Sequence, residues 1–123
     1  AMDGIVPHVN VLGLAACESA FRDCKDWHSE LIGYLRANRE MVLAAVNAQN
    51  GVKMNPVEAT YLAWIDVREL GLDHPAAHFE SHGIGLSDGK DFGAPGWLRL
   101  NFGCPRSTLE VALKRLRSAC LAA

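Results

Sequence analysis

The feature that most limits how this chain folds is an apolar run from Val9 to Phe21. The run carries a single charge, that of Glu18, and a helical period spreads its apolar residues around most of a helix instead of along one stripe. A helix that is apolar on all sides needs burial on all sides. A chain of 123 residues forms one domain and can hardly surround such a helix. We therefore expect either a partner or further protein sequence to cover it.

The composition is that of a folded domain, because half of the residues are hydrophobic and 21% are charged. The formal net charge of −2 gives no electrostatic reason to expect a nucleic acid or an anionic membrane as a partner. No apolar run approaches the roughly 20 residues of a membrane-spanning helix, and the first residues lack the pattern of a cleaved leader. We therefore expect a soluble, cytoplasmic protein.

The four cysteines contain no C-x-x-C pair; they are Cys17, Cys24, Cys104 and Cys120. On one helix Cys17 and Cys24 would have Cα atoms about 10 Å apart, which is too far for a disulfide. We expect four free thiols in a reducing compartment, most of them small core residues. A zinc site would need closer spacing.

The hydrophobic periodicity predicts an α+β domain with a small, mainly antiparallel sheet packed with helices. Four helices are predicted, at residues 10–24, 26–48 with Asp26 as its cap, 73–82, and from a capping box at Ser107–Glu110 to near the C-terminus. Four strands are predicted, at 52–54, 60–67, 84–86 and 97–102, with a loop at 87–93. Because both faces of residues 60–67 carry large apolar groups, we expect a central strand there.

Arg99 and Asn101 form the candidate binding site, because they project from the polar face of the strand predicted at 97–102. A planar guanidinium binds a carboxylate through two parallel hydrogen bonds, which is the pairing that recognition of an amino acid needs. The alternative is a strand face open to water, with Arg99 in an ordinary ion pair.

Three histidines, His74, His78 and His82, recur every fourth residue and would share one helix face. Two of them could hold a metal with Glu80 nearby, but the spacing is not the H-E-x-x-H of zinc proteases. A solvated polar face is the favoured interpretation.

Two further groups have plain structural interpretations. The glycines match neither G-x-G-x-x-G nor the P-loop and are predicted to serve turns; they are Gly83, Gly85, Gly89 and Gly93. The aromatic residues are predicted to belong to the core instead of a binding platform; they are Trp64, Trp97 and Phe102.

Four stretches together carry a family resemblance: WHSELIGYLRANR at residues 27–39, EATYLAWID at 58–66, GIGLSDGKDFG at 83–93 and GWLRLNFGCPR at 96–106. In this order and spacing they resemble the C-terminal portion of fold-type I pyridoxal-phosphate (PLP) enzymes. The resemblance is greatest to class I/II aminotransferases of the MalY/PatB type, which include cystathionine β-lyase-like C–S lyases. It covers nearly the whole chain from about residue 8.

The resemblance implies an organisation and a role for Arg99. From their own sequence, residues 1–7 are expected to be a tag scar and lead-in. By the resemblance, residues 8–48 would be a remnant of a large domain with a long linking helix, and residues 49–123 the small C-terminal domain. Arg99, in the R-L-N segment with Asn101, would bind the α-carboxylate of an amino-acid substrate. The parent enzyme would be a homodimer with active sites at the subunit interface.

The chain departs from the family at the cofactor site. The family holds PLP as an imine on a lysine of the large domain, together with an aspartate and a phosphate-binding cup. None of the lysines here has a matching context; they are Lys25, Lys53, Lys90 and Lys114. We therefore expect a fragment of a PLP-dependent aminotransferase or C–S lyase that has no catalytic residue of its own and is inactive alone.

Two other functions stay open from the residues. A free-standing module that binds small carboxylates without catalysis would be monodisperse, whereas a fragment would expose the Val9–Phe21 surface and self-associate through it. A metal-binding domain built on the three histidines ranks last.

Overall fold

The computed structural model describes residues 9–123, so the lead-in predicted at 1–7 lies outside the described residues. The described residues form two compact units, one that ends at Gly33 and one that runs from Tyr34 to Ala123. The division expected after residue 48 stays a prediction. None of the described helices is long and apolar enough to cross a membrane.

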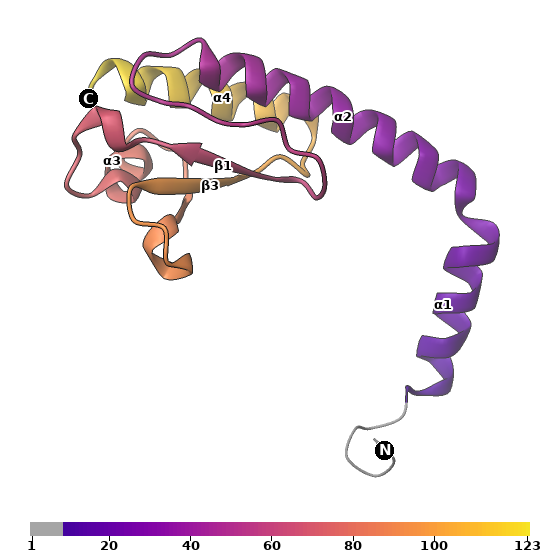
Figure 1. The fold of residues 1–123 in the computed structure, drawn as a ribbon. Helices are drawn as coiled ribbons and strands as arrows, with labels where there is room; N and C mark the ends of the chain where they lie inside the picture. Colours follow the sequence, from indigo (N-terminus) through magenta and orange to yellow (C-terminus); the bar gives the residue numbers. More distant parts are fainter. Residues whose placement is uncertain (1–8) are drawn as a thin grey trace. The chain divides into compact units, whose positions relative to one another are not determined.

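The chain is α+β, as predicted (Figure 1). The elements in chain order are α1 (Val11–Asp23), α2 (Lys25–Asn47), β1 (Leu62–Asp66), the 3₁₀ helix η1 (Arg68–Leu70), α3 (Pro75–Ser81), β2 (Ser87–Asp88), the 3₁₀ helix η2 (Gly89–Phe92), β3 (Trp97–Asn101) and α4 (Arg106–Leu121).

The sheet has three antiparallel strands in the order β1-β3-β2, so β3 is central. The expectation of a central strand at 60–67 was therefore wrong. Apolar groups on both faces of β1 reflect what packs above and below the strand, not what pairs beside it. The strand predicted at 52–54 is reduced to one bridge between Lys53 and Asp66, on the side of β1 away from β3.

The strand predicted at 84–86 is absent, and the predicted loop instead contains β2 and η2. The end of α3 explains this difference. The backbone N–H of Ile84 donates to the carbonyl of Phe79 at 3.1 Å, and Gly83, at φ 78°, turns the chain out of the helix. The apolar residue that resembled a strand is thus used to close a helix.

The start of α4 differs from the predicted capping box. The helix begins at Arg106, and the residue at its cap position, Pro105, makes no side-chain hydrogen bond. The backbone N–H of Arg106 donates to the hydroxyl of Tyr34 on α2 at 2.6 Å. A tyrosine distant in sequence therefore satisfies one of the backbone donors at the start of this helix. Similarly, α2 begins at Lys25, so Asp26 lies in its first turn instead of capping it.

The hydrophobic core of unit 34–123 joins one face of the sheet to the helices, and Figure 1 shows the sheet on one side of α2 and α4. Its largest fully buried apolar side chains are Phe79, Phe102, Ile65, Leu98, Leu109, Leu116, Val42, Val46 and Val67. The burial of Phe102 was predicted. Trp64 and Trp97 are only partly buried and lie outside the core cluster, because they occupy the other face of the sheet.

Asn38 is the fully buried polar residue of this core. Its Nδ2 donates to the carbonyls of Phe102 at 3.0 Å and Cys104 at 3.1 Å, and its Oδ1 accepts from Nε of Arg106 at 3.2 Å. Asn38 therefore ties α2 to the segment that joins β3 to α4.

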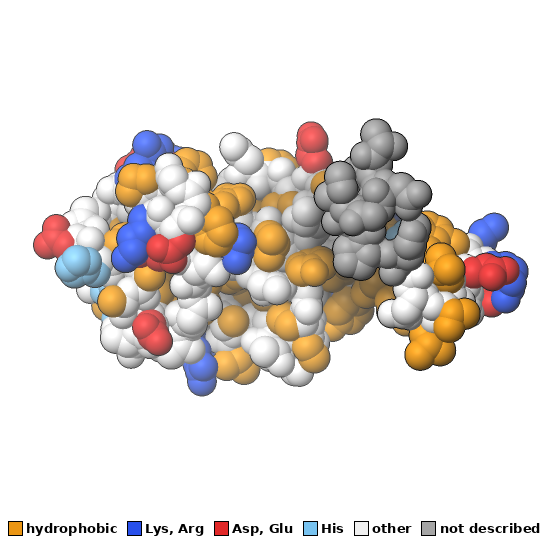
Figure 2. All heavy atoms as spheres, turned by 90° about the horizontal axis from the view of Figure 1, so that it is seen from below, with side chains coloured by type: hydrophobic (Ala, Val, Ile, Leu, Met, Phe, Trp, Pro, Cys, Tyr) orange, Lys and Arg blue, Asp and Glu red, His pale blue; other side chains and the backbone are white. Residues whose placement is uncertain are grey.

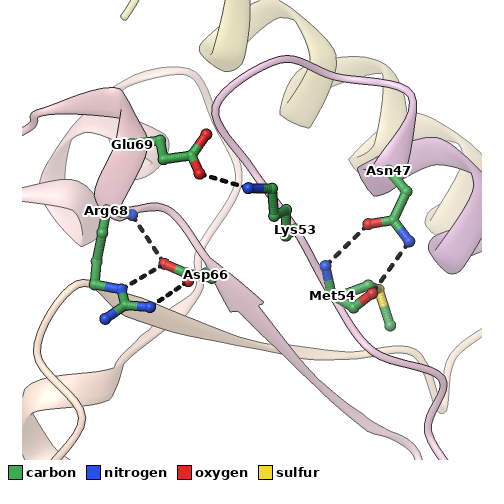
Figure 3. A network of polar contacts seen from close by, with 6 residues as sticks. All are labelled: Asn47, Lys53, Met54, Asp66, Arg68 and Glu69. Atoms are coloured by element: carbon green, nitrogen blue, oxygen red, sulfur yellow. Dashed lines mark hydrogen bonds and ion pairs between the residues drawn. The ribbon is translucent and has the colours of Figure 1, made fainter.

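A polar network holds the connection between α2 and β1 (Figure 3). The amide of Asn47 donates to the carbonyl of Met54 at 3.1 Å and accepts from its N–H at 2.9 Å. Nearby, Lys53 pairs with Glu69, and Arg68 pairs with Asp66 at 2.7 Å. These contacts fix the residues that leave the core helix and enter the sheet.

The Asp66–Arg68 pair predicts an acid-dependent part of the stability. The Arg68 side chain, which donates two hydrogen bonds to the carboxylate, holds the pKa of Asp66 below its ordinary value of 3.8. The stabilisation is therefore present above pH 3.8 and is lost as the pH falls through the lowered pKa. Because Arg68 is 62% exposed, Asp66→Asn is expected to cost no more than about 1 kcal/mol at pH 7.

Urea unfolding of the wild type and of Asp66→Asn at pH 7 and at pH 3 or below measures this effect. The difference between the two proteins should shrink as the pH falls, and Asp73→Asn on the exposed loop before α3 is the control. A difference that is constant with pH would contradict the assignment.

Candidate functional site

Arg99 occupies the middle of the central strand, on the face opposite the core. Its direct partners are Trp64 on β1 and Ser87 on β2. Directly paired residues of antiparallel strands point to the same face. The neighbours of Arg99 along β3, Leu98 and Leu100, are buried on the core side, as the alternation predicted.

The guanidinium of Arg99 has two close contacts. One of its N–H groups donates to Oγ of Ser87 at 3.3 Å. Its carbon lies 4.3 Å from the ring centroid of Phe92, and Trp64 meets that ring edge-on, with centroids 5.6 Å apart and planes at 85°. Arg99, Ser87, Phe92 and Trp64 form one group, the Arg99 cluster.

Arg99 takes part in none of the ion pairs formed among residues 9–123. The two carboxylates on neighbouring strands already have cationic partners, since Asp66 pairs with Arg68 and Asp88 with Lys90. The alternative of an ordinary ion pair at Arg99 is therefore not what the described residues show. The cluster presents a cation able to bind an anion.

A surface pocket of about 540 Å³ adjoins the cluster and shares Ser87 and Phe92 with it. Its lysine, Lys90, is paired with Asp88 at 3.0 Å. The backbone N–H and the side chain of Lys90 hold the pKa of Asp88 below its ordinary value, and the carboxylate in turn raises the pKa of Lys90. The lining also includes the carboxylates of Glu80 and Asp91, so the pocket has more acidic than basic side chains. Arg99 is a cation beside this pocket that forms no ion pair among residues 9–123.

Asn101 lies at the exposed end of β3, two residues beyond Arg99 on the same face. Its Oδ1 accepts a hydrogen bond from the backbone N–H of Gly103 at 2.8 Å. Half of its amide therefore stabilises the turn after the strand, and the NH₂ group is the half available to a ligand.

The three histidines do not all lie on one helix, although the rings of His78 and His82 lie side by side, with centroids 4.7 Å apart. The helix α3 begins at Pro75 and ends at Ser81, so His74 and His82 flank it. His78 donates from Nε2 to the carbonyl of Ala119 at 2.9 Å, and His82 donates from Nδ1 to the carbonyl of His78 at 2.9 Å. His78 thus links α3 to α4. Residues 9–123 contain no group of three or more His, Cys, Asp or Glu able to hold a metal ion.

The cysteines are free thiols in this structure, but they are not mostly core residues. Cys17 and Cys24 are exposed, whereas Cys104 and Cys120 are partly buried against the core. Burial raises the pKa of the Cys120 thiol.

Three members of the Arg99 cluster were missed by sequence reasoning. Trp64 was assigned to the core, and Ser87 and Phe92 to a loop. The alternation in residues 60–67 does place Trp64 on the face away from Ala63 and Ile65. Nothing local, however, indicates which residue of another strand lies opposite it.

The first unit exposes apolar surface, as the sequence predicted. No residue of α1 is buried, and Leu12 and Phe21 are 79% and 80% exposed. Figure 2 shows hydrophobic side chains at the surface of α1, on the right of the view. Where α1 meets the start of α2, a largely apolar pocket of about 850 Å³ is lined by Ala20, Phe21, Cys24, Lys25, Trp27 and His28.

Comparison with known proteins identifies the family. The profile of the family described as aminotransferase class I and II matches residues 5–116. A cystathionine beta-lyase of Corynebacterium glutamicum is 34% identical over 113 residues, which are 89% of this chain and 30% of that protein. The cystathionine beta-lyase PatB of Bacillus subtilis is 30% identical, over 90% of this chain and 30% of that protein.

Comparison with solved structures leads to the same family. The crystal structure of OvoB has 44% sequence identity and a TM-score of 0.92, covering 99% of this chain and 32% of that one. A putative PLP-dependent beta-cystathionase of Corynebacterium diphtheriae has 33% identity and a TM-score of 0.86, covering 97% and 33%. The chain spans about 30% of the length of the curated relatives named above. It belongs to the aminotransferase class I and II family, within the group that contains the cystathionine β-lyases.

Proposed function

We propose that this chain is the small C-terminal domain of a PLP-dependent aminotransferase or C–S lyase, and that Arg99 binds the α-carboxylate of its amino-acid substrate. The observation that carries the proposal is a guanidinium on the central strand with no ion-pair partner among residues 9–123. Relatives named cystathionine beta-lyase support the reaction class.

Arg99 would act by orientation. Its fork would hold the carboxylate through two hydrogen bonds, with the NH₂ group of Asn101 on the same face as a further donor. A carboxylate fixed in this way sets the position of the α-carbon, and such positioning lowers the barrier to reaction at that carbon. PLP in the parent supplies an electron sink for that chemistry.

The residues of this chain do not fit covalent attachment of PLP. Lys53 and Lys90 are exposed, and each is paired with a carboxylate, that of Glu69 and that of Asp88. These carboxylates raise the pKa of both amines and so favour the protonated form over the neutral form that attachment needs. Lys25 begins α2, and Lys114 lies on the exposed face of α4. Neither helix contributes a residue to the Arg99 cluster. We infer that the cofactor is held by protein outside these 123 residues and that this chain alone is inactive.

This inference predicts that the chain does not retain PLP. After incubation with PLP and reduction with borohydride, mass spectrometry should find no stoichiometric adduct at a single lysine. The parent enzyme, treated in the same way, should carry one. A specific adduct on Lys53 or Lys90 of this chain would contradict the inference.

We further propose that α1 is covered in the parent by the large domain, and that the parent is a cytoplasmic homodimer. The support for a covered α1 is the exposure of its apolar side chains, since no residue of this helix is buried. A surface of this kind is typical of an interaction site.

The chain alone is therefore expected to self-associate through the Val9–Phe21 surface. In sedimentation velocity, its average mass should rise with concentration. Replacing Leu12 and Phe21 by lysine should return it to a monomer, whereas Leu121→Lys should not, although Leu121 is 76% exposed. A wild-type chain that stays monodisperse would instead favour the alternative function, a free-standing module that binds small carboxylates.

A further inference from the structure

We propose that Phe92, backed by Trp64, is a positioning residue that holds the Arg99 guanidinium in the plane needed to bind a carboxylate. The inference rests on the proposed role of Arg99 and adds the residues that orient it.

The guanidinium is held from two directions. The Phe92 ring covers it, with 4.3 Å between the guanidinium carbon and the ring centroid. Ser87 accepts one of its five N–H donors at 3.3 Å. The other donors have no hydrogen-bond partner among residues 9–123. The Phe92 ring therefore restricts the tilt of the guanidinium, while the N–H groups along the edge of the guanidinium stay available to a carboxylate.

Trp64 fixes the ring that performs this task. It meets the Phe92 ring edge-on at 5.6 Å and 85°, which is a favoured aromatic arrangement. Trp64 is also the cross-strand partner of Arg99 in β1. The pairing of β1 with β3 thus fixes the positions of both Trp64 and Arg99, and the Phe92 ring contacts both side chains.

The backbone before Phe92 is held by close packing and by a side-chain cap. Gly89 is buried, and a Cβ there would collide with the carbonyl oxygens of Ala94 and Trp97. The Asp88 carboxylate accepts from the N–H of Lys90 at 3.0 Å and caps η2. These constraints place Phe92, the last residue of η2, over the central strand.

Core packing does not explain this position. Phe92 is 50% exposed and is not part of the hydrophobic core cluster. Keeping a large aromatic ring half in water leaves apolar surface unburied. The contact that the ring does make is with the cation of the candidate site.

Orienting Arg99 in advance removes an entropic cost from binding, because a free arginine side chain loses many rotamers when it is fixed. Loss of the Phe92 ring should therefore weaken carboxylate binding without changing the reaction that follows. We expect Phe92→Leu in the parent enzyme to raise the KM for L-cystathionine about 3- to 10-fold, with kcat unchanged. The Kd for L-alanine, measured from the absorbance of bound PLP, should rise by a similar factor.

Phe92→Tyr and Val111→Ala are the matched variants. Tyrosine keeps the aromatic face, so Phe92→Tyr should retain the wild-type KM and Kd. Val111 is 46% exposed on α4 and lies outside the cluster, so its truncation controls for loss of half-exposed apolar surface.

The outcomes distinguish the positioning role of Phe92 from the proposed carboxylate-binding role of Arg99. If Arg99→Ala raises KM and Kd but Phe92→Leu changes neither, the positioning role is wrong and the proposed function stands. If Phe92→Tyr is as weak as Phe92→Leu, the aromatic face is not the feature that matters, and the inference is again overturned. If Arg99→Ala leaves KM and Kd unchanged, the proposed function itself fails.

Discussion

Replacing Arg99 by alanine in the parent enzyme is expected to lower kcat/KM for L-cystathionine about 10- to 100-fold. A hydrogen bond that involves a charged group contributes about 1.5–3 kcal/mol, and about 1.4 kcal/mol corresponds to a factor of ten in rate. KM should rise because the substrate loses the contact with its carboxylate, and kcat should fall because the α-carbon is no longer held in position. Steady-state kinetics measures both constants.

Two variants make this result specific. Arg99→Lys keeps the charge but loses the planar fork, so it should recover only part of the lost kcat/KM. Arg117→Ala removes an exposed arginine of α4 and should leave the kinetics unchanged. An unchanged kcat/KM in Arg99→Ala would contradict the assignment of the carboxylate to this residue.

The largest stability loss is expected from Asn38→Leu. The substitution removes two donors to the carbonyls of Phe102 and Cys104 inside the core. A buried polar group left without a partner costs about 1–3 kcal/mol, so the free energy of unfolding should fall by about 2–4 kcal/mol. Urea unfolding of this chain, followed by circular dichroism, measures the change.

Asn50→Ala is the matched control, because Asn50 is exposed in the turn after α2 and makes no side-chain hydrogen bond among residues 9–123. Its effect should stay within about 0.5 kcal/mol. If Asn38→Leu costs no more than this control, the link between α2 and the segment after β3 is not what stabilises the unit.

Sequence patterns predicted the elements whose signal is local. Periodicity, caps and turn residues predicted the four α-helices of residues 9–123. The alternation at 97–102 put Leu98 and Leu100 in the core and Arg99 on the opposite face. Strand order is different, because it depends on pairing between distant segments. The central place of β3 and the two-residue strand β2 therefore had no local signal.

The candidate site divides in the same way. Arg99 was indicated by its residue type, its place on a polar strand face and the family resemblance. Trp64 and Ser87 join it only through the register across the sheet, and Phe92 through the constrained turn at Gly89. Asn38 was missed because a polar residue on an amphipathic helix is normally assigned to the solvent side.

The measurement that tests the central claim most directly is the coupling between Arg99 and the ligand carboxylate. The affinities of the PLP-loaded parent enzyme for L-alanine and for ethylamine, the same amine without the carboxylate, are compared in the wild type and in Arg99→Ala. The account predicts that loss of the carboxylate weakens binding strongly in the wild type and little in the variant. An equal loss in both proteins would show that the carboxylate is bound elsewhere.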